Sequence, residues 1–469
     1  MSTRQTDARS FARWVALITA VGLVGRVVYV LLVTRHQTVW GDAYFYHESS
    51  NLIAQGKGFI NPIDWIQNHV RNQAADHPPL YLIYLAGWSW LGVTSTTGHL
   101  LVSTLLGAAT IAVTAYAGKE IAGRRVGLIA AVIVCIYPNV WAPDGMLLSE
   151  TMAILTVAVT MLLAYRFWHR PSLARAAWMG VAVGLATMSR SELILLSVLV
   201  IVPLVLLVRT VSLWRRIGWI GAAAATCLAV VGPWVAFNMT RFDHPVYLSA
   251  GYEITLSTST CDLTWYGEFT GYWNIQCPIQ VLQRHGVNSQ GTDQSVLAKL
   301  FRDDSIEYIR NHEKRLPYVI LARWGRITGL YKPLQQVDLD HFPEGRNIWV
   351  ARAALAGWFI VAPLAIGGAI SLRKRRIPVF PLLGPPIVVM VAVTITFATT
   401  RYRASAEGAI CLLAAVGVDA LITFYQRLRD DPEDARRPSA PGPLGDGEED
   451  EGRGVDRLGD RELVGGDRG

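Results

Sequence analysis

The sequence predicts an all-α membrane protein that crosses the bilayer about ten times. Hydrophobic residues make up 52% of its 469 residues and charged residues only 17%, which is typical of polytopic membrane proteins. Arginines and lysines fall in short clusters between long apolar runs, as the positive-inside rule describes. The net charge of +7 is therefore interpreted as a signature of topology, and no nucleic-acid partner is expected.

Residues 14–34 form the first apolar run, which reaches the ~20 residues needed to cross a bilayer core. Its length, the presence of Arg26 and the lack of a small-residue cleavage site favour a retained span over a signal peptide. We expect Arg26 to extend its charged end toward the membrane surface. The N-terminus is then cytoplasmic, and residues 35–97 form the first outer loop.

The first outer loop includes an apolar run at 80–93 that is too short to cross the membrane, so we expect it in the interface. That choice places the basic connectors 119–125, 166–175 and 209–216 in the cytoplasm, in agreement with the charge rule. The nine further predicted spans are 98–118, 126–142, 145–165, 176–189, 191–208, 214–237, 347–371, 377–399 and 404–425.

Two polar stretches complete the predicted organisation. Residues 238–346 are polar and aromatic and form a second, larger outer loop. Residues 426–469 are rich in Pro, Gly, Asp, Glu and Arg and poor in aromatic residues, so they are predicted to be a disordered cytoplasmic tail. The chain is thus predicted to be a multi-pass cell-membrane protein. Its transmembrane domain covers residues 1–425, and both of its termini are cytoplasmic.

Asp42 follows the first span directly, among the aromatic residues Trp40, Tyr44, Phe45 and Tyr46. These rings would shield the carboxylate from water, and Tyr44 could stack on a sugar ring. A carboxylate in a partly water-excluded site can act as a general base on an acceptor hydroxyl. For Asp42 alone, a helix cap or a solvated surface charge is the plain alternative.

Three further residues combine charge with unusual positions. His77 precedes two prolines that start a short aromatic helix; its imidazole could bind a phosphate or a metal, or merely border the helix. Glu150 opens the fourth span, where the helix dipole favours acids, although a carboxylate inside a span is costly unless it is functional. Arg190 lies between two spans and could either snorkel or clamp a phosphate.

Two pairs of arginines are candidates for contacting lipid phosphate. Arg401 and Arg403 form a short turn on the predicted outer side, against the positive-inside bias, which favours a phosphate role. Arg323 and Arg326 belong to an amphipathic segment, residues 316–333, which we expect in the interface near anionic headgroups.

The larger outer loop contains Cys261 and Cys277 on either side of a short aromatic segment. Two cysteines outside the membrane should form a disulfide in an oxidising compartment, which would contribute roughly 3 kcal/mol in the chain-entropy view. No further ligands stand at a suitable spacing for zinc. A divalent metal ion that replaces part of a cationic phosphate clamp stays open as a cofactor.

Taken in order, these motifs resemble the GT-C superfamily of membrane glycosyltransferases. Within it they resemble family 39 of actinobacterial type, with the protein O-mannosyltransferases and aminoarabinose transferases. The resemblance covers residues 14–425. It rests on Asp42, the Pro-Pro-Leu-Tyr run ending at Tyr81, the Ser-Glu pair at Glu150, the MSRSEL motif and the Arg-Tyr-Arg turn. It implies a GT-C-type fold and transfer of a hexose or pentose from a polyprenyl-phosphate-linked donor at the outer face.

The resemblance also implies residue roles. Asp42 would be the general base and Glu150 an acid near the active site. His77 and Arg190 match positions where the aminoarabinose transferases hold the lipid phosphate with lysines. The turn at 401–408 matches a phosphate-binding pattern whose two prolines are replaced here. The remaining candidates for substrate binding are Tyr44, Tyr81, Arg323, Arg326, Arg401 and Arg403.

Two other function classes stay open. A transporter or flippase of lipid-linked sugars would keep charges near the bilayer midplane and often shows repeated halves, whereas most candidate charges here lie at the ends of spans. A non-catalytic scaffold for cell-envelope assembly would use the aromatic outer loop to bind a partner. For the enzyme, the acceptor is a glycan, a lipid or a protein.

Overall fold

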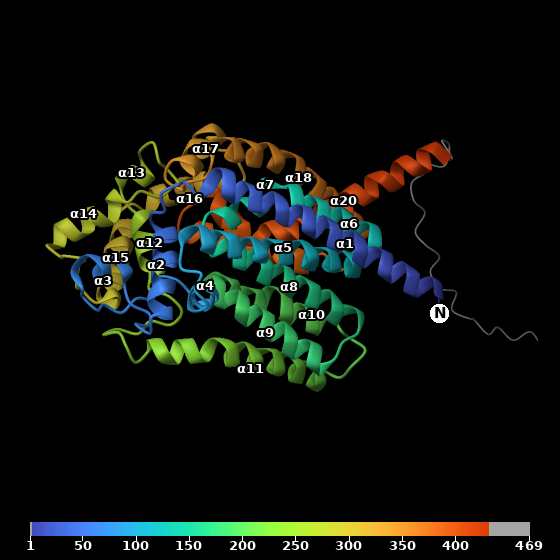
Figure 1. The fold of residues 1–469 in the computed structure, drawn as a ribbon, viewed down its shortest axis with the longest axis horizontal. Coiled ribbons are helices and arrows are strands. Elements are labelled where there is room, and N and C mark those ends of the chain that lie inside the picture. Colours follow the sequence, from blue (N-terminus) through green and yellow to red (C-terminus); the bar gives the residue numbers. More distant parts are fainter. Residues whose placement is uncertain (1, 431–469) are drawn as a thin grey trace, which may run out of the picture. The chain divides into compact units, whose positions relative to one another are not determined.

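The computed structural model describes the backbone of residues 2–430 and the side chains of residues 9–430. The regular secondary structure of the described residues consists of helices, with no strand (Figure 1). A single isolated bridge joins Ile60 and Gln73. The all-α prediction is therefore confirmed for the described chain. The longer apolar helices and their short companions are α1 (Ser2–Tyr29), α5 (Thr96–Ala122), α6 (Arg124–Ile136), α7 (Pro138–Trp141), α8 (Glu150–His169), α9 (Leu173–Ser189), α10 (Val202–Leu206), α11 (Leu213–Asn238), α18 (Ile348–Lys374), α19 (Phe380–Ile395) and α20 (Ala404–Asp430).

Each predicted span corresponds to an apolar helix or a broken helix, but the count of ten crossings is not confirmed. The two helices Arg124–Ile136 and Pro138–Gly145 meet at a bend of 70°, and counted together they add a seventh candidate span to the six unbroken ones. Three apolar helices, Leu173–Ser189, Ser191–Leu206 and Phe380–Ile395, are shorter than a full crossing. Six segments in the described residues are long and apolar enough to cross a membrane: Arg9–Thr34, Thr96–Ala122, Glu150–His169, Leu213–Asn238, Ile348–Lys374 and Thr400–Asp430.

Proline explains why the predicted span 126–142 is broken. Tyr137 has an extended backbone (φ −77°, ψ 116°) between α6 and α7, as expected for a residue that precedes proline. Pro138 then starts α7, where its missing N–H costs no helical hydrogen bond.

The described chain divides into two units, and the boundary between them lies between Leu421 and Ile422. Helix α20 extends to Asp430, so residues 426–430 of the predicted disordered tail are helical. The rest of that predicted tail, residues 431–469, lies outside the described residues.

Small residues allow neighbouring helices of the first unit to approach closely. A Cβ atom on Gly180 of α9 would overlap the carbonyl oxygen of Ala223 on α11. Gly368 of α18 and Gly417 of α20 likewise face backbone carbonyl groups of each other's helix, with no room for a side chain. Such small-residue contacts are typical of helix packing in membranes, where close backbone approach provides the attraction.

A buried ion pair ties the first span to the bundle. Arg26 of α1 donates through Nε to Asp144 at 2.7 Å, and both side chains are only 2% exposed. Its other nitrogens donate to the carbonyl oxygens of Gly22 and Val134. The expectation that Arg26 extends to the membrane surface is therefore wrong, because carboxylate and carbonyl partners satisfy the guanidinium inside the bundle. Gly107 of α5 makes room for the pair, since a Cβ there would overlap Asp144 Oδ2.

The two predicted outer loops lie at the same end of the long helices and contact each other (Figure 1). Arg241, just after α11, donates to the carbonyl oxygens of Phe59 and Ala74 in the first loop. The Ala250 amide donates to the Ala75 carbonyl at 2.7 Å. The helices of these loops are α2 (Asp42–Ala54), α3 (Pro62–Asn68), α4 (Leu80–Trp90), α12 (Gly251–Thr258), α13 (Asp262–Trp265), α14 (Gln276–His285), α15 (Gln294–Asn311), α16 (Leu316–Ile327) and α17 (Pro333–His341).

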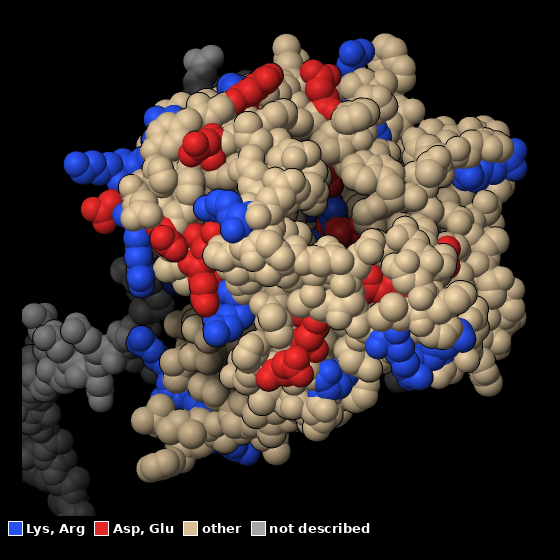
Figure 2. All heavy atoms as spheres, turned by 90° about the vertical axis from the view of Figure 1, so that its left-hand side faces the viewer, with Lys and Arg blue, Asp and Glu red and all other residues tan. Residues whose placement is uncertain are grey.

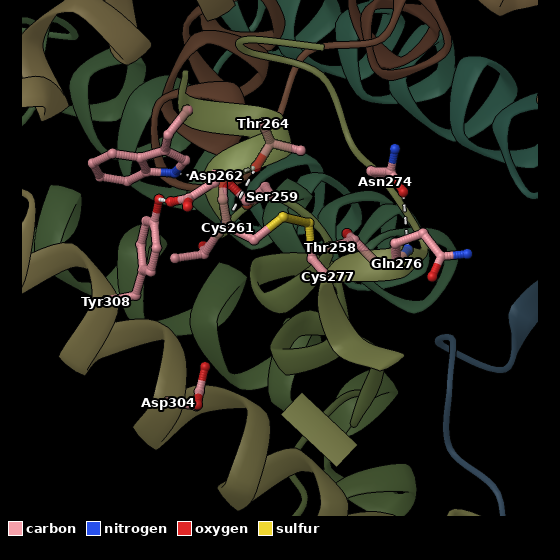
Figure 3. Close-up of a disulfide and its surroundings, with 12 residues drawn as sticks. Thr258, Ser259, Cys261, Asp262, Thr264, Asn274, Gln276, Cys277, Asp304 and Tyr308 are labelled. Atoms are coloured by element: carbon pink, nitrogen blue, oxygen red, sulfur yellow. Dashed lines mark hydrogen bonds between the residues drawn. A yellow bond between two sulfur atoms is a disulfide. The ribbon is translucent and has the colours of Figure 1, made fainter. Parts of the chain in front are cut away.

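The predicted disulfide between Cys261 and Cys277 is confirmed and closes the aromatic segment between α12 and α14 (Figure 3). The Tyr308 hydroxyl of α15 donates to Asp262 at 2.6 Å next to the bridge. These contacts fix the ends of a loop whose middle carries two aromatic residues of the candidate site described below.

Gly107→Ala should destabilise the protein, because the added methyl group would force apart the buried Arg26–Asp144 pair. Overpacking costs about 1–3 kcal/mol and breaking a buried ion pair about 3–5 kcal/mol. We therefore expect the purified protein in detergent to melt several degrees lower. The matched control is Gly25→Ala, where a Cβ meets no atom within 4 Å. Equal melting temperatures for the two variants would show that the pair tolerates the extra group.

Candidate active site

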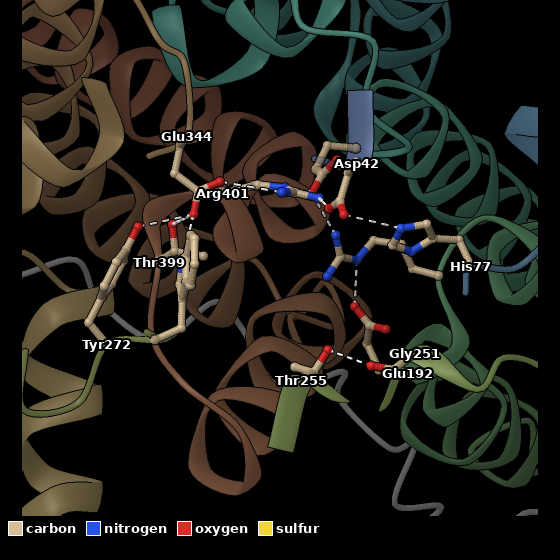
Figure 4. Close-up of polar contacts among 12 residues, drawn as sticks. Asp42, His77, Glu192, Gly251, Thr255, Tyr272, Glu344, Thr399 and Arg401 are labelled. Carbon is tan, nitrogen blue, oxygen red and sulfur yellow. Dashed lines mark hydrogen bonds and ion pairs between the residues drawn. The ribbon is translucent and has the colours of Figure 1, made fainter. Parts of the chain in front are cut away.

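Arg401 brings together three carboxylates from distant parts of the chain (Figure 4). Its Nη2 pairs with Asp42 at the start of α2, and its Nε donates to Glu150 at the start of α8 at 2.5 Å. Its Nη1 lies 3.3 Å from Glu344, which follows α17. We call Arg401, these three acids and the adjoining Arg190, Glu192 and His77 the Arg401 cluster.

The turn before α2 directs Asp42 toward this cluster. Gly41 has φ 57° and ψ −132°, a backbone conformation that glycine adopts without steric cost. Asp42 is the first residue of the helix, and its Oδ1 lies 3.4 Å from His77 Nε2. The His77 ring stacks on Tyr46, with ring centres 4.9 Å apart. The side chain of Asp42 stays 36% exposed, which leaves room for a reacting group beside it.

Opposite charges shift the titration of Asp42 and His77. Burial raises the pKa of Asp42, but the nearby Arg401 and His77 outweigh it and hold that pKa well below its usual range. Burial lowers the pKa of His77, but Asp42 and Asp76 outweigh it, so the His77 pKa is raised. At neutral pH Asp42 is therefore ionised, and His77 keeps its proton to a higher pH than an unperturbed imidazole.

Glu150 and Arg190 form the inner part of the cluster. Glu150 is fully buried, and its Oε1 accepts hydrogen bonds from Arg190 at 2.8 Å and from Arg401. Its Oε2 has no hydrogen-bond partner among the described residues. Arg190 also pairs with Glu192 at 2.6 Å, and its guanidinium lies over the Tyr402 ring at 4.9 Å. Arg190 is thus held by acids inside the protein and does not snorkel.

No sequence motif singles out Glu344. It accepts hydrogen bonds from Tyr272 at 3.1 Å and Trp273 at 3.0 Å, both in the disulfide-closed loop. It also lies 3.4 Å from the Thr399 hydroxyl. Glu344 therefore links the second loop to Arg401. Its only signal in the sequence is an acid in a long polar stretch. Glu192, within the MSRSEL motif, was missed as well.

Acids outnumber cations in the cluster. Asp42, Glu150, Glu192 and Glu344 face two guanidinium groups and the imidazole of His77. All three nitrogens of Arg401 and two of Arg190 contact carboxylates, so an incoming anion must compete with carboxylates for them. In the part of the chain that the structure describes, no three His, Cys, Asp or Glu side chains are arranged to hold a metal ion. The end of the molecule with the two loops is hollowed, and charged side chains of both signs lie deep in the hollow (Figure 2).

Arg403 points away from the cluster, so the expectation that it works beside Arg401 is wrong. It pairs with Glu407 at 2.6 Å, donates to the Ile327 carbonyl, and lies over the Trp358 ring at 3.8 Å. The physical reason is helical geometry, because side chains two residues apart face different directions.

Arg323 and Arg326 are buried, so their predicted place beside lipid headgroups is also wrong. Arg323 donates to the Thr394 carbonyl at 2.8 Å, and Arg326 donates to the Thr270 carbonyl at 2.7 Å. Helix α16 is amphipathic, but its arginines face the interior of the protein and an apolar side chain, Leu321, is 62% exposed. The loop carbonyls need buried donors, and the arginines supply them.

The two tyrosines expected at the site support it only indirectly. Tyr81 is buried, its hydroxyl pairs with Ser103 at 2.7 Å, and its ring packs edge-on against Tyr46. Tyr46, and not the half-buried Tyr44, contacts His77. The structure therefore joins Asp42, His77, Glu150, Arg190 and Arg401 from the predicted set.

Arg401→Met should destabilise the protein, because Glu150 would lose one of two cationic partners in a fully buried position. Removing one member of a buried pair typically costs about 3–5 kcal/mol. In the double variant with Glu150→Gln, part of this loss should be recovered. Melting curves of the purified variants test the coupling, with the exposed Arg352→Met as control. Strictly additive effects would contradict it.

The comparisons with known proteins give one family and a set of distant structures. Residues 76–237, roughly a third of the chain, match the family described as dolichyl-phosphate-mannose-protein mannosyltransferase. No curated protein matches the sequence significantly.

Among solved structures, the chain is similar to the archaeal oligosaccharyltransferase AglB from Archaeoglobus fulgidus in complex with an inhibitory peptide and a dolichol-phosphate. The two are 15% identical with a TM-score of 0.47, over 92% of this chain and 53% of that one. This chain thus spans about half the length of that enzyme.

It is also similar to ArnT from Cupriavidus metallidurans bound to undecaprenyl phosphate, at 15% identity and a TM-score of 0.41, over 91% of this chain and 82% of that one. These TM-scores are too low for either structure to carry an argument about this chain. The family match covers the segment that contains His77, Glu150 and Arg190. Over residues 76–237 the chain is thus similar to the dolichyl-phosphate-mannose-protein mannosyltransferases, in agreement with the resemblance to GT-C membrane glycosyltransferases that its motifs indicate.

Proposed function

We propose that this protein transfers a sugar from a polyprenyl-phosphate-linked donor to an acceptor hydroxyl at the outer face of the membrane. The observation that carries the proposal is the contact of Arg401 with Asp42 and Glu150, which joins a candidate base to a candidate phosphate clamp. The family match supports a lipid-phosphate donor, since its description names dolichyl-phosphate-mannose. The proposal places the cluster on the extracytoplasmic side, with both termini in the cytoplasm.

In the proposed reaction the acceptor oxygen attacks the anomeric carbon of the donor sugar. The bond between that carbon and the phosphate oxygen breaks, and its electrons leave with the polyprenyl phosphate. The acceptor proton moves to the carboxylate of Asp42, so the base must lie within hydrogen-bond distance of the acceptor. Each transfer therefore releases one polyprenyl phosphate and one proton.

The cations of the cluster fit the charge that develops in this step. The donor phosphodiester carries one negative charge, and the released phosphate monoester gains a second. Preorganised cations that face a developing charge are among the largest sources of catalysis. Arg401, Arg190 and protonated His77 are the groups that would stabilise the leaving phosphate, and no general acid is then required.

The ion pair between Asp42 and Arg401 limits the ability of Asp42 to act as a base. A carboxylate whose pKa is held low is a poor proton acceptor. When a phosphate takes over the hydrogen bonds of Arg401, Asp42 loses the neighbour that lowers its pKa. Donor binding would thereby raise the basicity of Asp42, so the base becomes active only beside a bound donor.

Asp42→Asn should abolish transfer, because the amide cannot accept the acceptor proton. General-base catalysis contributes about 10²–10⁴-fold, so we expect at least a hundredfold loss in release of polyprenyl phosphate by purified protein. The matched control is Glu48→Gln on the same helix, since Glu48 lies 3.8 Å from His47 and forms no ion pair with Arg401. Wild-type rates from a well-folded Asp42→Asn variant would remove Asp42 from the mechanism.

The pH dependence of kcat/KM should report the proton on His77. Its raised pKa means that the imidazolium persists above the usual value of about 6.5. Activity should therefore fall as pH rises through this raised value, where the cation is lost. His77→Lys should keep its charge at higher pH and shift the fall upward, and His77→Gln should remove it and lower the rate throughout. An unchanged alkaline limb in His77→Lys would assign it to another group.

A further inference from the structure

A second cavity lies at the other end of the long helices, away from the Arg401 cluster. Its volume is about 460 Å³, and its lining includes Ser172, Leu173, Val208, Arg215, Gly218 and Trp219. Helix α8 has the cluster at its first residue and the loop that leads to this cavity after its last. With 20 residues in α8, the two sites are about 30 Å apart. The cavity is therefore separate from the candidate active site.

The connecting segments that border this cavity are basic, although one of their arginines, Arg166, pairs with Glu120 of α5 at 3.4 Å. The two connecting segments, 166–175 and 207–216, contain six arginines and one histidine and no Asp or Glu. Arg175 donates to the Arg166 carbonyl oxygen in the last turn of α8, and Arg216 donates to the Leu206 carbonyl oxygen at the end of α10, which stabilises the two connections. Arg215 lines the cavity itself and has no ion pair to any described acid. A guanidinium in this position is available for a phosphate, which it matches in a bidentate way.

Exposed apolar side chains next to these arginines indicate what kind of phosphate would bind. Trp214 is 82% exposed at the start of α11, and Leu173 at the start of α9 is 56% exposed. Trp178, one turn further along α9, is 60% exposed. Tryptophan and leucine beside arginine at the ends of apolar helices are typical of the membrane–water interface. A ligand here would meet a cationic headgroup site and an apolar surface together.

We propose that this cavity binds the headgroup of an anionic phospholipid, with its phosphate at Arg215 and its acyl chains against the apolar surface of α9 and α11. The volume lies within the range of small-molecule sites, about 300–1,000 Å³. The N-termini of α9 and α11 both border the cavity, and their free amides add to the attraction for an anion. Basic pockets between membrane helices are a known way to recognise anionic lipids.

Two variants separate the charge of this site from its shape. Arg215→Ala removes the guanidinium. Gly218→Leu fills the cavity without changing any charge, and the substitution is compatible with the fold because a Cβ at position 218 meets no atom within 4 Å. The matched control is Arg373→Ala, an exposed arginine of α18 at the same end of the bundle but outside the cavity lining.

The experiment measures lipid binding to the delipidated full-length protein in detergent. Phosphatidylglycerol, phosphatidylcholine and inorganic phosphate are titrated separately, and complexes are followed by native mass spectrometry and by the shift in melting temperature. We expect the wild type and Arg373→Ala to bind phosphatidylglycerol equally. We expect Arg215→Ala and Gly218→Leu to bind it at least about tenfold more weakly, since a charge-assisted hydrogen bond contributes roughly that factor.

Three outcomes would overturn the proposal. Undiminished phosphatidylglycerol binding by both cavity variants would show that the lipid binds elsewhere. Equal binding of phosphatidylcholine would make the cavity an apolar site without selectivity for anionic headgroups. An equal shift with inorganic phosphate would identify an anion site that does not use acyl chains. None of these binding measurements depends on glycosyl transfer, so they test this proposal independently of the function proposed above.

Discussion

The arrangement of this molecule depends on one shared cation. Arg401 lies in the short helical turn Thr400–Arg403 just before α20 and contacts acids from α2, from α8 and from the loop after α17. Burying Glu150 without such partners would be very unfavourable. Each of these elements must therefore be in place before the others can bury their charge. The same interaction that holds the two loops to the helix ends also supplies the candidate phosphate clamp.

Stability and function make opposing demands on this cluster. The carboxylates contact all three nitrogens of the Arg401 guanidinium, which neutralises the buried charges but leaves Asp42 with a lowered pKa. A phosphate would relieve that pairing and take its place. Because acids outnumber cations in the cluster, the phosphate must compete with carboxylates for Arg401, and its binding makes the basicity of Asp42 sensitive to the donor.

The described helices separate two kinds of charged environment. At one end, acids and arginines alternate in a hollow and compensate each other. At the other end, Arg215 lies beside exposed tryptophan and leucine and has no ion pair with any described acid, although Arg166 nearby pairs with Glu120. Paired charges can be buried, whereas unpaired arginines remain near water or headgroups. This contrast is why the first region is a candidate for chemistry and the second for lipid binding.

The sequence alone determined the class of the fold, the approximate position of each apolar helix and the Cys261–Cys277 bridge. These features follow from local composition and from spacing along the chain. It also selected Asp42, Glu150 and Arg401, because charged residues at the ends of apolar runs are rare enough to notice.

Only the tertiary structure decided which charges meet. Asp42 and Arg401 are separated by 359 positions, and no local pattern specifies such a contact. The direction in which each side chain points could not be predicted from the sequence either. Arg403 turns to Glu407, and Arg326 turns inward to a loop carbonyl, because the nearest partner in space satisfies a guanidinium. Glu344 joined the site for the same reason, since its role arises from where the loop after α17 folds and not from the residues beside it.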